Sequence, residues 1–111
     1  MSESELRRAA NEALFRDVNE QIERLQGRLA VSSDEPLRLV CECAQLECTQ
    51  QFPVPIRVYE RVRADAHLFL VIPGHVDASI ESIVDSAGSY LIVRKHPGDP
   101  GTVAEITDPR A

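Results

Sequence analysis

The first quarter of the chain carries a helical pattern of apolar residues. These recur at steps of four, four, four, four, three and four residues, close to the helical period of about 3.6. They are Leu6, Ala10, Leu14, Val18, Ile22, Leu25 and Leu29. Ser2 followed by Glu5 is typical of a capping box, and Gly27 favours a helix end near Gln26. The pattern therefore predicts one long helix over residues 2–29.

The apolar stripe of this helix has two interpretations. The favoured one is that the stripe packs on a sheet formed by the rest of the chain. The alternative is that it pairs with another helix, because a helix of this length is long for the residues that remain. In that case the partner or self-association surface consists of Leu14, Val18, Ile22 and Leu25.

Beyond a polar linker at 30–36, apolar residues fall in short runs separated by Pro and Gly, as is typical of strands and turns. Pro53 restricts its run to a sheet edge, and Pro55 suits the first turn of a helix. The expected elements are a strand at 37–41, an edge strand at 51–54, a helix at 55–64, a central strand at 68–72, a hairpin at 80–86 and 89–95, and a strand at 102–106. The first hairpin arm also fits a short helix.

These elements predict an α+β fold with a long N-terminal helix, a small mostly antiparallel sheet and a short helix. The 111 residues fit one domain, in which the helix at 1–29 precedes a small zinc-binding α+β part at 30–111. Aromatic residues make up 5% of the chain and Trp is absent, so the core must be mostly aliphatic. A small core of this kind gains from a metal staple.

Charge and hydropathy exclude several classes of protein. The formal net charge of −6 argues against nucleic acid as the main partner, because phosphate binding depends on an excess of Lys and Arg. No apolar run approaches the roughly 18 residues that a membrane span needs. The opening MSESELRR is acidic and polar and is unlike a signal peptide. We therefore expect a cytoplasmic protein.

The three cysteines of the chain lie within eight positions, in VCECAQLECTQ. Cytoplasmic thiols stay reduced, so clustered cysteines there are more often metal ligands than disulfides. Thiolates at Cys41, Cys43 and Cys48 are typical ligands of a tetrahedral Zn²⁺ site. The other interpretation is three small buried side chains, which is common for free Cys.

Three thiolates leave one position for a fourth ligand. His75 is the favoured candidate, because Pro73 and Gly74 form a turn signal directly after the predicted strand at 68–72. His67 precedes the same strand and belongs at its other end. The alternatives are His96, an acidic residue (Glu42 or Glu47), or no metal at all.

The spacing Cys-x-Cys-x4-Cys resembles the post-SET zinc loop of histone lysine methyltransferases, although no SET core exists in this chain. Over nearly its whole length the chain looks like a family of small uncharacterised bacterial proteins of high-GC Gram-positive type. The segments that carry this resemblance are RAANEALFRDVNEQIE (8–23), VCECAQLECTQ (40–50), YERVRADAHLFLVIPGH (59–75), YLIVRK (90–95) and TDPR (107–110). The resemblance implies the cysteine motif plus Pro-Gly-His and no particular activity. Ala44 stands where a glycine is expected.

The function indicated is a non-catalytic zinc-binding interaction or regulatory module, with structural Zn²⁺ held by three Cys and one His. No Gly-rich phosphate loop, Ser-His-Asp set or His-Glu-x-x-His motif is present. The alternative is a redox or metal-responsive thiol sensor, since oxidation of zinc thiolates releases the metal. A zinc-dependent hydrolytic enzyme, with Glu42 or Glu47 as base beside a zinc-bound water, is less favoured.

Overall fold

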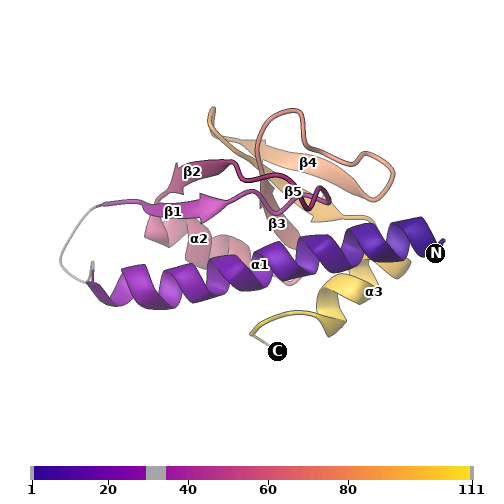
Figure 1. The fold of residues 1–111 in the computed structure, drawn as a ribbon, viewed down its shortest axis with the longest axis horizontal. Coiled ribbons are helices and arrows are strands. Elements are labelled where there is room, and N and C mark those ends of the chain that lie inside the picture. The colour runs from indigo at the N-terminus through magenta and orange to yellow at the C-terminus, as the bar shows by residue number, and fades with distance from the viewer. Residues whose placement is uncertain (1, 30–34, 111) are drawn as a thin grey trace.

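The computed structural model describes residues 2–29 and 35–110, so most of the predicted linker lies outside the described residues. Within these residues, three helices and five strands follow one another (Figure 1). They are α1 (Glu3–Leu29), β1 (Leu37–Val40), β2 (Gln51–Val54), α2 (Ile56–Arg63), β3 (Leu68–Val71), β4 (Glu81–Ser86), β5 (Leu91–Lys95) and α3 (Asp99–Ile106). The predicted α+β fold is confirmed.

The strands form two antiparallel sheets. β1 pairs with β2, and Arg38 lies opposite Pro53 in this two-stranded sheet. The other sheet has the order β3-β5-β4, with a bulge in β4 between Ile83 and Asp85. The predicted hairpin is therefore confirmed as a pair of strands, and Gly88 in its turn takes a positive φ of 82°.

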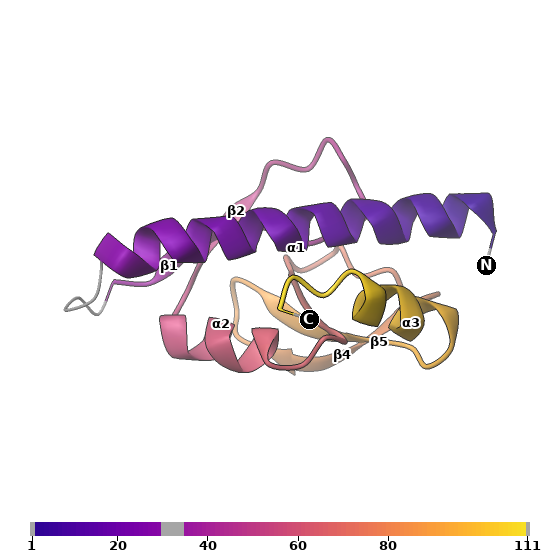
Figure 2. The same cartoon turned by 90° about the horizontal axis from the view of Figure 1, so that it is seen from below.

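Helix α1 spans the molecule. In Figure 2 it runs along one side, with α2, α3 and the three-stranded sheet on the other. The main core cluster lies between the two sheets and α2, and includes Leu39, Val54, Tyr59, Phe69 and Val93. At the start of α1, the backbone N–H of Glu5 donates to Ser2 Oγ at 3.1 Å, as the capping signal predicts. No described helix has the length and apolar character needed to cross a membrane.

The prediction that 68–72 is a central strand is wrong, because β5 occupies the middle of the sheet and β3 lies at one edge. The free edge of β3 is covered by Glu42. The backbone N–H of Glu42 donates to Leu70 O at 2.7 Å, and Leu70 N–H donates to Glu42 Oε1 at 3.0 Å. Covering of this kind lets an apolar edge strand be buried.

The predicted strand at 102–106 is also wrong, because this segment is part of α3. Pro100 lies in the first turn of α3, where a missing N–H costs nothing, and Asp99 is favoured there by the helix dipole. Gly101 and Ala104 turn inward and are buried. Asp99 followed by Pro100 is a helix-start signal that the prediction of a strand did not take into account.

The favoured interpretation of α1 is contradicted as well, because its apolar stripe faces outward. Leu6, Leu14 and Leu25 are 50%, 51% and 67% exposed, and Val18 is 37% exposed. Of the stripe, Ile22 is half-buried and packs against the core. The side of α1 that faces the rest of the molecule is instead largely polar, and its buried residues are Ala9, Glu12, Arg16, Asn19 and Glu20.

Long-range hydrogen bonds explain why polar residues are buried under α1. Arg16 donates to the carbonyls of Ala66 and Ala104, at 2.6 and 2.8 Å, and its guanidinium lies 4.4 Å from the centre of the Phe69 ring. Because Ala104 is in the last turn of α3, Arg16 places a cation at the negative end of that helix. Glu20 accepts hydrogen bonds from Tyr59 Oη and Arg110 Nε, each at 2.8 Å.

A second buried charge cluster lies nearer the start of α1. Lys95 Nζ forms ion pairs with Glu81 of β4 and, at 2.7 Å, with Glu12 of α1. The ammonium also lies 4.5 Å from the centre of the Phe69 ring. Two carboxyls therefore share one buried cation. Burial raises the pKa of Glu12 to about 8, although Lys95 acts to lower it.

Candidate metal centre

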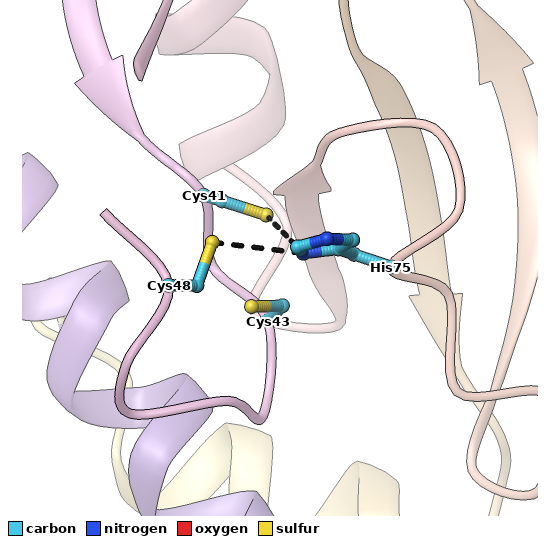
Figure 3. A group of neighbouring side chains, drawn as sticks. All are labelled: Cys41, Cys43, Cys48 and His75. Atoms are coloured by element: carbon cyan, nitrogen blue, oxygen red, sulfur yellow. Dashed lines mark hydrogen bonds between the residues drawn. The ribbon is translucent and has the colours of Figure 1, made fainter. Parts of the chain in front are cut away.

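The cysteine segment begins where β1 ends. Cys41 N–H donates to Gln50 O at 3.1 Å, which continues the β1–β2 ladder by one residue. A turn follows in which Cys48 N–H donates to Gln45 O at 3.0 Å. The extended backbone puts the side chains of Cys41 and Cys43 on the same side, and the turn brings Cys48 back toward them. Figure 3 shows the three sulfur atoms converging.

His75 comes from a tight turn directly after β3. His75 N–H donates to Ile72 O at 3.1 Å, and Gly74 has a φ of 88°. Pro73 followed by a residue of positive φ gives a type II turn, for which Pro-Gly is the preferred sequence. The turn directs the imidazole toward the thiols (Figure 3).

The four side chains form one cluster. His75 Nδ1 lies 3.8 Å from Cys41 Sγ and 3.6 Å from Cys48 Sγ. One donor atom from each of the four residues lies within 4.8 Å of every other. Ligands that are 2.0–2.3 Å from a tetrahedral metal are separated by about 3.3–3.8 Å, so the two distances from His75 match such a site and the widest pair would have to close by about 1 Å. These four residues could hold a metal ion.

Hydrogen bonds and burial give the thiols different acidities. A hydrogen bond from Cys41 lowers the pKa of Cys43 to about 5. The same hydrogen bond, with burial, raises the pKa of Cys41, and burial raises that of Cys48. Ile72 N–H also points at Cys41 Sγ, at 3.2 Å, and favours negative charge on that sulfur. The cluster therefore holds one thiolate readily, and a bound cation would favour the others.

The burial of the cluster differs from one side to the other. Cys41 and Cys43 are each 1% exposed, whereas Cys48 and His75 are half-buried. One side of the cluster thus faces the core, and the other is reached by solvent.

Glu42 lies between two of the cysteines and points into the protein. Its carboxylate accepts hydrogen bonds from Arg63 Nη2, at 3.0 and 2.9 Å, and from Asn19 Nδ2, at 2.7 Å. Together with the Leu70 N–H, these donors engage both carboxylate oxygens. Glu42 is thus a buried anchor for the cysteine segment, which the sequence did not predict. The hypothesis that it serves as a base or ligand is not supported by this geometry.

The other candidate ligands lie elsewhere. His96 Nε2 is 2.8 Å from Ser82 Oγ, and His67 Nε2 is 2.7 Å from Glu105 Oε1. Glu47 is exposed on the cysteine loop. Within the described part of the chain, Cys41, Cys43, Cys48 and His75 form the one group of this kind that comes together.

Comparisons with known proteins identify no relative. No protein-family model, no curated protein and no solved structure matches the chain. The resemblance to small bacterial proteins and to the post-SET loop therefore stays a prediction.

Proposed function

We propose that this chain is a small zinc-stabilised interaction or regulatory module, in which Cys41, Cys43, Cys48 and His75 hold a structural Zn²⁺. The observation that carries the proposal is the convergence of one donor atom from each of these residues within 4.8 Å. Thiolate and imidazole are the donors that zinc takes in tetrahedral structural sites. Four protein ligands fill the coordination sphere, which leaves no position for a reactive water.

A structural role is supported by where the ligands come from. The cysteines lie between β1 and β2, at the end of the two-stranded sheet, whereas His75 follows β3 of the other sheet. A metal bound by all four would join the two sheets. Since a preformed site is absent from the unfolded chain, its binding free energy would stabilise the fold.

The interaction surface of the proposed module is the outer face of α1, formed by Leu14, Val18 and Leu25. Exposed apolar residues on one helix face are typical of a surface that binds another protein or a second copy of the chain. Ile22, which was expected in this set, is partly buried and contributes less. We place such a module in the cytoplasm, where its thiols stay reduced.

Native mass spectrometry of protein purified without a chelator or a His-tag tests the metal. We expect one Zn²⁺ per chain in the wild type and loss or weakening of binding in His75→Ala. The matched control is His96→Ala, which should bind like the wild type because His96 faces Ser82. A wild type that holds no metal would contradict the proposal.

Sedimentation of the wild type and of Leu14→Glu tests the interaction surface. Self-association predicts a concentration-dependent rise in mass that the variant abolishes, with zinc content unchanged. If the wild type is a monomer at all concentrations, self-association is excluded and the proposed partner is a different protein. Failure of Leu14→Glu to impair the binding of such a protein, once identified, would contradict this surface.

The second candidate, a redox or metal-responsive thiol sensor, is favoured by the partial exposure of Cys48. An accessible zinc thiolate can be oxidised, which releases the metal. Zinc release by low-micromolar peroxide, reversed by a thiol reductant, would support a sensor. Thiols that stay reduced under that treatment would contradict the sensor and favour the structural role.

A further inference from the structure

Helix α1 contacts both of the segments that carry the metal-ligand residues. Asn11 Nδ2 donates to Ala44 O at 3.1 Å, next to Cys43. Asn19 binds both the N–H and the C=O of Val40, the residue before Cys41. Its Nδ2 donates to Val40 O at 2.8 Å, and Val40 N–H donates to its Oδ1 at 2.8 Å. Two amides of one helix thus fix the backbone on either side of the first two cysteines.

The same helix holds the histidine segment. Arg8 Nη1 forms an ion pair with Asp77, which lies two residues after His75. The Asp77 N–H is fixed in turn by Glu81 Oε2 at 3.0 Å. Arg8, Asn11 and Asn19 therefore place the cysteine segment and the histidine segment relative to each other through a single rigid element.

Ligand positions are sensitive to such supports. Groups that orient metal ligands typically contribute ten- to a hundredfold to metal affinity. By linkage, any contact that helps the metal to bind is strengthened by the bound metal to the same degree. If α1 sets the distance between the two ligand segments, a metal that fixes this distance also favours the docked helix.

We propose that the docking of α1 is coupled to occupancy of the Cys41–Cys43–Cys48–His75 site, with Arg8, Asn11 and Asn19 as the positioning residues. Metal binding tightens α1 onto the domain, and metal loss loosens it while the three-stranded sheet stays folded. Because α1 carries the exposed apolar surface, the metal would control how rigidly that surface is presented. This inference rests on the proposed function, since it requires that the site bind a metal.

Zinc affinity of variants tests the coupling from the helix side. A chromophoric chelator competes for Zn²⁺ with the wild type, Arg8→Ala, Asn11→Ala and the double variant. The matched control is Glu20→Gln, on the same helix, because the partners of Glu20 are Tyr59 and Arg110, outside both ligand segments. Arg8 and Asn11 are only partly buried, so these variants should fold.

We expect the double variant to bind Zn²⁺ at least about tenfold more weakly than the wild type. Glu20→Gln should bind within about twofold of the wild type, even where urea denaturation of the zinc-loaded proteins shows an equal loss of stability. Equal zinc affinity in the wild type and the double variant would overturn the proposal. A Glu20→Gln variant as weak as the double variant would also overturn it, because the effect would then be general destabilisation.

Hydrogen exchange of the wild type with and without EDTA tests the coupling from the metal side. We expect chelation to speed exchange in α1 and in the cysteine segment, with little change in β3 and β5. Faster exchange confined to the cysteine segment, or spread equally over all elements, would overturn the coupling. A wild type that binds no zinc at all would instead remove the proposed function on which it rests.

Discussion

Two buried charge clusters lie under helix α1 and differ in the number of cations available to each carboxyl group. Glu42 and Arg63 form a one-to-one pair, and both oxygens of the carboxylate accept hydrogen bonds. Glu12 and Glu81 share a single cation, Lys95, and therefore leave one negative charge unbalanced. In the unbalanced cluster, burial raises the pKa of Glu12 to about 8, and the charge of the nearby Glu81 carboxylate adds to this rise. Both Glu12 and Glu42 are fully buried, so the two clusters differ in the cations and hydrogen-bond donors around each carboxyl group.

Removal of the cation from the balanced pair should have the largest effect. Arg63→Met leaves the Glu42 carboxylate buried beside the cysteine segment without a counter-charge, so the free energy of unfolding should fall by about 3–5 kcal/mol. Urea denaturation measures this. The control is Arg61→Met, on the exposed side of α2, which should change stability by less than about 0.5 kcal/mol. A loss below about 1 kcal/mol for Arg63→Met would show that the pair is dispensable.

Removal of Lys95 from the unbalanced cluster should lower the free energy of unfolding less at acidic pH than at basic pH. Lys95→Met leaves Glu12 and Glu81 facing each other, and protonation relieves their repulsion. We expect a loss of about 2–4 kcal/mol at pH 8 and a clearly smaller loss at pH 5.5, from denaturation at both values. Equal losses at both pH values would contradict repulsion between the carboxylates as the cause of the loss.

The unbalanced cluster should also give the wild type a pH dependence. The pKa of Glu12 is raised from 4.5 to about 8 in the folded protein. The folded state therefore binds the proton more tightly than the unfolded state, and stability from this group falls as the pH rises between these values. The change should be of the order of a few kcal/mol. Glu12→Gln, which imitates the neutral acid, should flatten the dependence, and an unaltered slope in this variant would exclude Glu12 as its origin.

The outer face of α1 should show the smallest effect. Leu14 is 51% exposed, so Leu14→Gln should change the stability of the single chain by less than about 0.5 kcal/mol. Leu39→Ala is the comparison at a buried position. Its free energy of unfolding should fall by about 2–5 kcal/mol because Leu39 is completely buried. Thermal or urea denaturation of both variants at low protein concentration makes the comparison. Comparable losses would mean that the apolar face of α1 is covered.

The sequence predicted those features that depend on neighbouring residues. The long helix, the hairpin around Gly88 and the turn at Pro73 and Gly74 follow from local backbone preferences. The cluster of three cysteines with His75 was predicted because its spacing reflects ligand chemistry rather than packing. Its members come together in the structure, and metal binding stays a prediction.

The features that the sequence did not predict depend on distant partners. The apolar period of α1 indicated an inward stripe, but Arg16, Asn19 and Glu20 are buried because their partners lie 21 to 91 positions away along the chain. Glu42 was a candidate base by analogy with a glutamate beside a zinc-bound water, because no local pattern identifies Arg63 as its partner. The edge position of β3 could not be predicted from its apolar sequence, because Glu42 covers the strand and so permits apolar residues there.

The amides that α1 directs at β1 have a consequence for the protein in concentrated solution. Asn19 occupies both backbone groups of Val40, and Gln26 Oε1 accepts from Arg38 N–H at 3.3 Å. Two side chains, seven positions apart on a helix, thus imitate the hydrogen bonds of a neighbouring strand. An open strand edge is a template for intermolecular pairing and aggregation. With α1 in place this edge of β1 is occupied, so we expect the helix to limit intermolecular pairing at β1.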